Sequence, residues 1–147
     1  LTHSQIERIM YTYKQCKEGN TMQTTKTITL STVAQDPKYY TVEDLATIMG
    51  AAKQAAHDAA MAHLAQHGEH AYCGFAWVNI YGIKGNTKLG RAMKQAGYEK
   101  DYTGAYSIWN PSGLGTQCMS TKEAGAQAAA AVFKACGFTA YAGSRAD

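Results

Sequence analysis

AYCGFAWVNIY, residues 71–81, is the segment that decides the predicted fold. It is rich in aromatic and β-branched residues, which indicates a strand at the centre of a sheet. The next segment, TKLGRAMKQAG (87–97), predicts a short helix that begins at Asn86 or Thr87 and stops at Gly97. A strand followed closely by a helix is the first unit of a mixed α and β domain.

The remainder of the chain continues this alternation. DYTGAYSIW (101–109) predicts a second strand. Ser120 and Glu123 have the S-x-x-E spacing of a capping box, which starts a helix that Gly137 ends. FTAYAG (138–143) predicts the last strand.

The predicted order of elements over residues 71–147 is therefore β-α-β-α-β. It indicates an α/β or α+β fold: a small sheet of three to four strands, packed by helices. Residues 1–70 form a mainly helical N-terminal part of the same single domain. We expect a helix over 4–17, a strand over 25–33, and the longest helix from Val42 to about Gln66.

Composition excludes several classes of protein. The 147 residues make one domain's worth of chain, and no apolar run approaches the ~18–20 residues of a membrane span. The net charge of +3 is compatible with a polyanion partner but is well short of a histone-like composition. The first residues are polar, so we expect no signal peptide, and we expect a cytoplasmic location with reduced thiols at four widely spaced cysteines: Cys16, Cys73, Cys118 and Cys136.

The loop and helix at 81–94 form the first candidate ligand site. Gly82 and Gly85 make the loop flexible, and Asn86 and Thr87 precede a helix whose free N–H groups would attract an anion. Neither the Walker nor the G-x-G-x-x-G fingerprint is present, so we expect no cofactor. The basic residues expected to contact phosphate are Lys84, Lys88, Arg91 and Lys94; the alternative is a solvated basic face.

The second candidate is the loop in WNPSGLGTQCMS (109–120). Tyr106 and Trp109 would stack on a base, although their odd spacing places them on opposite faces of a strand. Tyr102 would share the face of Tyr106. Backbone donors would come from the loop itself, through Asn110, Ser112, Gly113 and Gly115. If the sheet is parallel, this loop and the basic loop share one edge, where ligands usually bind.

A metal site or a nucleophile is the enzymatic alternative. His63 and His67 lie one helical turn apart, and His70 and Cys73 follow at spacings that could complete a tetrahedral site. Because closed zinc sites usually carry CxxC pairs, we expect no metal. Cys118 precedes a helix N-terminus, which would stabilise a thiolate, but no partner base is identifiable. We assign no catalytic residue.

The second half of the chain resembles small uncharacterised bacteriophage-encoded α/β proteins. The matching strings are KLGRAMKQAGY, WNPSG, KEAGAQA and GFTAYAGSR, which together cover about half of the sequence. The resemblance implies a viral accessory protein and transfers no catalytic residue. Such proteins bind host proteins, nucleic acid or nucleotides.

Three functional hypotheses follow. The leading one is a phage-type accessory protein that binds nucleic acid or a nucleotide without catalysis. The second is a protein–protein inhibitor or assembly module acting on a host or viral protein, with homo-oligomers formed through the Ala-rich helix at 42–66. The third is a small enzyme that uses Cys118 or the His/Cys cluster.

Overall fold

The computed structural model describes residues 36–70 and 72–147. The helix and strand expected over 4–17 and 25–33 lie outside these residues. A 3-10 turn, Pro37–Tyr39, precedes the main elements, which are α2 (Val42–His67), β1 (Gly74–Tyr81), α3 (Lys88–Gln95), β2 (Glu99–Lys100), β3 (Tyr106–Trp109), α4 (Met119–Ala135) and β4 (Thr139–Ala146).

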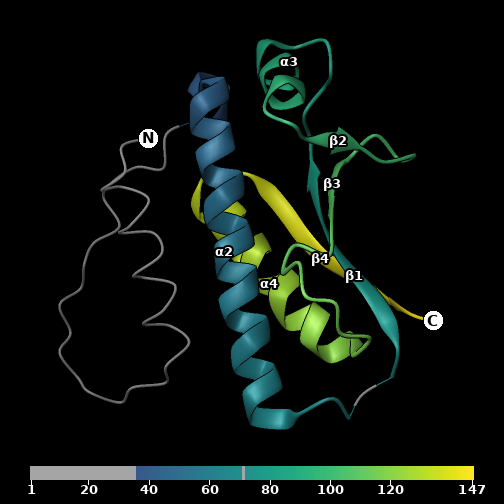
Figure 1. The fold of residues 1–147 in the computed structure, drawn as a ribbon. Coiled ribbons are helices and arrows are strands. Elements are labelled where there is room, and N and C mark those ends of the chain that lie inside the picture. The colour runs from purple at the N-terminus through teal and green to yellow at the C-terminus, as the bar shows by residue number, and fades with distance from the viewer. Residues whose placement is uncertain (1–35, 71) are drawn as a thin grey trace, which may run out of the picture.

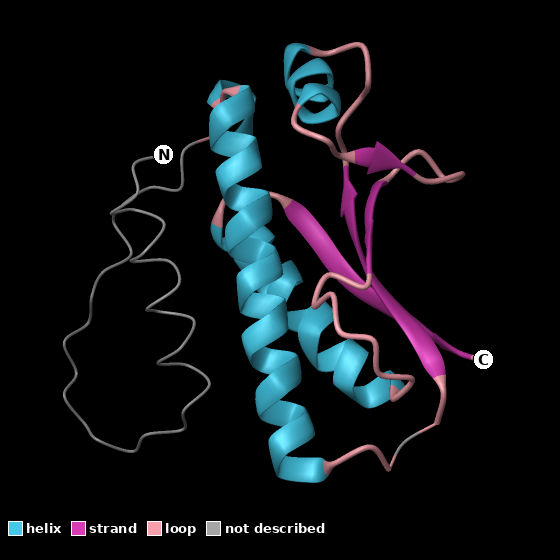
Figure 2. Ribbon diagram, in the orientation of Figure 1, coloured by secondary structure: helices cyan, strands magenta, loops and turns pink. Residues whose placement is uncertain are grey.

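The four strands form one sheet in the order β2-β3-β1-β4, so β1 lies at its centre as predicted. Every neighbouring pair is antiparallel, which corrects the parallel arrangement considered above. The chain order from β1 onward is β-α-β-β-α-β, in which each helix joins two parallel strands with a third strand between them, the split β-α-β arrangement. The mixed α and β fold with a four-stranded sheet is confirmed (Figure 2).

The segment 101–109, predicted as one strand, is a turn followed by β3. The Asp101 carboxylate accepts hydrogen bonds from the N–H (2.8 Å) and hydroxyl (2.6 Å) of Thr103 and from the N–H of Ala105 (3.2 Å). These bonds hold the pKa of Asp101 below its ordinary value. Tyr102 is fully exposed in this turn and therefore shares no strand face with a neighbour.

Both predicted helices, 42–66 and 87–97, are present as α2 and α3, with local signals at their ends. Thr41 and Asp44 form a reciprocal capping box at the start of α2, and Gly68 ends that helix. The Thr87 hydroxyl caps α3, and Gly97 follows that helix in the left-handed region, with φ of 92°. These signals are local, so the sequence alone was sufficient to predict them.

The start of α4 differs from the prediction. The helix begins at Met119 with Cys118 as its N-cap, and no side chain caps it, so the predicted Ser120–Glu123 capping box is wrong. The Met119 N–H donates to the Tyr72 carbonyl at 2.8 Å, which fixes the chain before the helix starts. The Glu123 carboxylate instead accepts a hydrogen bond from the Ser144 hydroxyl on β4.

Small residues bring α2 and α4 together on one side of the sheet (Figure 1). At Gly125 of α4, a Cβ atom would lie 3.1 Å from the Ala56 carbonyl oxygen of α2 and 3.0 Å from Cβ of Ser112. The Ala-rich face of α2 is buried in this contact through Ala52, Ala55, Ala56 and Ala60. The face considered for homo-oligomers is therefore occupied within the chain.

Of these two helices, α4 lies directly on β1 and β4, while α2 packs on α4. Phe133 of α4 lies in the core with Val78 and Ile80 of β1. The first crossover helix, α3, has only eight residues and lies beyond the end of the sheet (Figure 1). None of the helices in the described ranges is long and apolar enough to cross a membrane.

The α2–α4 contact gives a stability prediction. Gly125→Val should lower the free energy of unfolding by about 1–3 kcal/mol, because the new side chain overpacks a backbone contact. Gly50→Val is the matched control: it lies in α2 with nothing within 4 Å of its Cβ position, so stability should change by less than about 0.5 kcal/mol. Urea denaturation measures both. Equal effects would contradict the close approach of the helices.

Candidate functional site

The two loops that were candidates for one ligand cleft leave the sheet at different ends. The basic loop follows Tyr81, the last residue of β1, whereas the second loop follows Trp109 of β3. Trp109 pairs with Trp77, four residues before Tyr81, or about 13 Å back along β1 at about 3.3 Å per residue. Because the sheet is antiparallel, the loops do not share an edge.

The basic loop closes on itself. The Arg91 guanidinium donates to the Asn86 carbonyl at 2.7 Å, and the Thr87 hydroxyl donates to the Lys84 carbonyl at 2.6 Å. The same hydroxyl accepts the Gly90 N–H, so that N–H is not free for an anion. The loop and helix carry exposed basic residues at Lys84, Lys88, Arg91 and Lys94, and Gly85 is also exposed.

The second loop is a closed turn packed against α2. Asn110, in the left-handed region with φ of 42°, donates its amide N–H to the Leu114 carbonyl and accepts the Ser112 hydroxyl. Ser112 is buried, and its carbonyl lies 3.3 Å from Nδ1 of His57. The side chains of Asn110 and Ser112 are therefore engaged within the chain, and the loop glycines are exposed (Gly113 and Gly115).

The His and Cys side chains considered as an alternative metal site do not assemble. Nδ1 of His63 lies 3.2 Å from the Thr121 hydroxyl, and the His63 and His67 rings are 4.6 Å apart. Over 36–70 and 72–147, no three His, Cys, Asp or Glu side chains come close enough together to hold a metal ion, so His70 and Cys73 complete no site. Cys118 is the N-cap of α4 and is buried, with Sγ 3.2 Å from the Ser120 hydroxyl.

Tyr106 and Trp109 lie on opposite faces of β3, as their spacing predicted. Tyr106 is 3% exposed, and its hydroxyl donates to the Gly90 carbonyl at 3.1 Å. Burial raises the pKa of this phenol. Trp109 is 59% exposed. Tyr106 is therefore part of the core and offers no ring face to a ligand, whereas Trp109 does.

The face of the sheet that carries Trp109 is aromatic. Along β1 every second residue is buried toward the helices, and the residues between them point to the other face: Phe75, Trp77, Asn79 and Tyr81. Tyr141 of β4 pairs with Asn79 and is exposed on the same face. We call the five rings the aromatic strip: Phe75, Trp77, Tyr81, Trp109 and Tyr141.

The rings of the aromatic strip contact one another in two groups. Trp77 and Trp109 are parallel, with an interplanar angle of 1° and centroids 5.5 Å apart, and Phe75 lies 5.4 Å from Trp109. Tyr81 and Tyr141 are 6.1 Å apart. Tyr81, Trp109 and Tyr141 are exposed, whereas Phe75 and Trp77 are half-buried. Exposed apolar patches are candidates for interaction sites.

A glycine of β4 makes room for this packing. Gly143 pairs with Trp77, and a Cβ atom there would lie 2.7 Å from Nε1 of the Trp77 indole. The indole therefore rests against the backbone of β4, and a larger residue at 143 would displace it. This contact holds Trp77 beside Trp109.

Between the two groups of rings lies a polar side chain. The Asn79 amide donates to the Tyr81 hydroxyl at 3.2 Å, while its Oδ1 is buried with no hydrogen-bond partner among the described residues. Buried acceptors are usually paired, and an unpaired one costs free energy.

Basic side chains lie at the border of the aromatic strip. Nζ of Lys134 is 4.8 Å from the Tyr141 ring centroid, a cation–π contact. Arg145 of β4 is exposed and pairs directly with Phe75 across the ladder. The strip therefore has a cation beside each group of rings.

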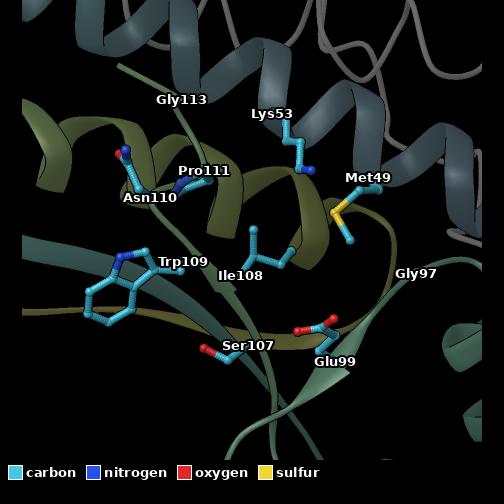
Figure 3. A pocket seen from close by; sticks show the side chains of 10 residues that line it. All are labelled: Met49, Lys53, Gly97, Glu99, Ser107, Ile108, Trp109, Asn110, Pro111 and Gly113. Atoms are coloured by element: carbon cyan, nitrogen blue, oxygen red, sulfur yellow. The ribbon is translucent and has the colours of Figure 1, made fainter. Parts of the chain in front are cut away.

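A groove of about 280 Å³ adjoins the strip at the beginning of β2 (Figure 3). It lies between α2, which contributes Met49 and Lys53, and the outer edge of β3. Its lining is Met49, Lys53, Gly97, Glu99, Ser107, Ile108, Trp109, Asn110, Pro111 and Gly113. Trp109 belongs to both the groove and the aromatic strip.

No protein-family model, curated protein or solved structure matches this chain. The candidate site therefore rests on the aromatic strip and the groove. Sequence reasoning found Trp109 but missed Phe75, Trp77, Tyr81, Tyr141 and Arg145. The signal was the alternation in GFAWVNIY, where large rings occupy every second position except at Asn79.

The contact at Gly143 predicts a spectroscopic change. The chain has two tryptophans, Trp77 and Trp109, so their signals report on the strip alone. Gly143→Val should displace the Trp77 indole and alter the near-ultraviolet circular dichroism of the stacked pair. Gly115→Val is the control, because nothing lies within 4 Å of its Cβ position. An unchanged spectrum in the Gly143 variant would refute the packing of Trp77 on β4.

Proposed function

We propose that this chain is a phage-type accessory protein that binds single-stranded nucleic acid across the open face of its sheet, without catalysing a reaction. The observation that carries the proposal is the aromatic strip, with three touching rings on the two central strands. The sequence resemblance of the second half to small bacteriophage proteins supports the viral setting.

The chemistry of the strip suits unpaired bases. Every base has a planar π-face, and stacking on an aromatic side chain contributes roughly 1–3 kcal/mol per base. Four-stranded sheets that recognise RNA place such rings on the same two central strands and stack two or three bases there. The similarity to those sheets concerns the arrangement of strands and rings only. The strip itself extends from Phe75 to Tyr81, about 20 Å along β1 at about 3.3 Å per residue.

Phosphate contacts would come from the border of the strip. Arg145 stands beside Phe75 at one end, and Lys134 stands beside Tyr141 toward the other. Lys84 follows the end of β1 three residues after Tyr81 and would extend the same path. The basic side chains of α3 play no part in this proposal, because α3 lies beyond the end of the sheet rather than on its open face.

Removing the exposed ring tests stacking. Trp109→Ala should weaken binding of a short single-stranded oligonucleotide by roughly 5- to 150-fold, the loss of about one stacked base. Tyr102→Ala is the control, because that ring is fully exposed in the turn after β2 and lies off the strip. Fluorescence anisotropy of labelled DNA and RNA at low salt measures both. Wild-type affinity in the Trp109 variant, or no binding by the wild-type protein, would refute the proposal.

Salt dependence tests the phosphate contacts. For single strands, the logarithm of affinity falls with the logarithm of salt by about 0.7 for each phosphate neutralised. Arg145→Gln should therefore lower this slope by about 0.7. Lys94→Gln, which removes the same charge from exposed α3, should leave the slope unchanged. The opposite result would move the phosphate site to α3.

A further inference from the structure

In the groove, one residue of β3, Trp109, has backbone N–H and C=O groups that no neighbouring strand of the described residues pairs. The Asp101 N–H donates to the Ala105 carbonyl at 2.8 Å, and the Asn110 N–H donates to the Ala76 carbonyl of β1 at 3.0 Å. Odd-numbered residues of β3 therefore direct their backbone groups toward β2, and even-numbered residues direct theirs toward β1. Trp109 is odd-numbered, so its N–H and C=O point into the groove beyond the beginning of β2.

Among the described residues, the backbone of Trp109 has no strand partner on the β2 side, because the chain before β2 turns away from it. The β2–β3 register, in which Glu99 pairs with Ser107, would place Gly97 opposite Trp109. Gly97 instead has φ of 92° at the exit of α3, and within the described ranges no strand pairs with Trp109 on that side. The edge stops at Pro111, which has no N–H.

A single free residue is too short for an added peptide strand, which takes its affinity from a row of main-chain hydrogen bonds. It suits a small planar ligand that needs one donor and one acceptor. The groove volume of about 280 Å³ is near the lower limit of small-molecule sites, about 300 Å³. Both the volume of the groove and the single free residue at the edge of β3 favour a ligand with one ring system.

The other polar groups of the groove have opposite character. Glu99 supplies a carboxylate, which only accepts hydrogen bonds, and Lys53 supplies an ammonium group, which only donates them. In Figure 3, Lys53 and Met49 extend from α2, Glu99 extends from β2, and Ile108 points toward the helices between them. Met49 and Ile108 give the groove apolar surface against which a ring can pack.

We propose that this groove holds a guanine base of the bound strand. The inference rests on the proposed function, because the base would leave the aromatic strip at Trp109 and enter the groove beside it. Guanine has two adjacent N–H donors, at N1 and N2, for the Glu99 carboxylate and the Trp109 carbonyl. Its O6 and N7 acceptors match the Trp109 N–H and the Lys53 ammonium group.

The other bases match this set of groups less well. Adenine and cytosine have an amino group but no neighbouring ring N–H, and thymine and uracil have a ring N–H but no amino group. Each would leave part of the acceptor set unpaired, and a site built for hydrogen bonds discriminates against a ligand that lacks them. The groove would thus select one base, while the strip binds its neighbours regardless of sequence.

The test compares thymidine oligonucleotides that carry one central guanine, adenine, cytosine or inosine, with uridine RNA versions alongside. Guanine should bind on the order of tenfold more tightly than thymidine alone. Inosine, which lacks only the amino group, should lose most of this preference without any change to the protein. Glu99→Gln should abolish the preference but keep thymidine binding, and Glu43→Gln, at the start of α2, should keep both.

The outcomes separate the two proposals. Equal affinity for all oligonucleotides, or a guanine preference that persists in Glu99→Gln, would overturn the guanine site and leave the stacking face intact. Binding of no oligonucleotide would overturn the proposed function and the guanine site together. A guanine preference lost both with inosine and in Glu99→Gln would support the assignment, and circular dichroism checks that the variant is folded.

Discussion

The close contact between α2 and α4 is the constraint on which the rest of the structure depends. A Cβ atom at Gly125 would lie 3.1 Å from the Ala56 carbonyl oxygen and 3.0 Å from Cβ of Ser112, closer than side chains usually pack, and small residues line the contact on both helices. This contact joins α2 to α4, and α4 in turn lies on β1 and β4. Both helices thus lie on one side of the sheet (Figure 1), and the aromatic strip lies on the other side.

The antiparallel order of the strands then determines which residues meet. Pairing of Trp77 with Trp109 on one side and with Gly143 on the other brings two indoles together, although they lie 32 residues apart in the chain. The same order separates the basic loop from the loop after β3. The exit of α3 at Gly97 and the turn at Asp101 limit β2 to two residues, which leaves the edge of β3 open beside α2. The aromatic strip and the groove are therefore both consequences of topology.

Local signals in the sequence predicted α2, α3 and β1 because their determinants are neighbours in the chain. The Thr41–Asp44 box and the glycines at 68 and 97 act within one helical turn. The S-x-x-E spacing of Ser120 and Glu123 gave a wrong prediction for the start of α4. That start is determined by pairing between the segment before α4 and the segment before β1, which is distant in the sequence.

The site was less predictable than the fold. The opposite facing of Tyr106 and Trp109 followed from their odd spacing, but the spacing could not tell which of the two was buried. Predicting the aromatic strip would have required the pairing register of β1, β3 and β4, and that register links residues that are far apart in the sequence. In β1 buried and less buried residues alternate. The period of two in GFAWVNIY was therefore the sequence signal that these rings share one face.

Photo-cross-linking tests base stacking on the open face of the sheet, because it locates a bound base on the protein. A single-stranded oligonucleotide containing iodouracil is bound, irradiated and digested, and the linked peptide is identified by mass spectrometry. We expect links within Gly74–Tyr81 and Tyr106–Trp109, the strands that carry the touching rings. Links confined to Lys88–Gln95 of α3 would contradict this expectation and assign binding to the basic helix instead.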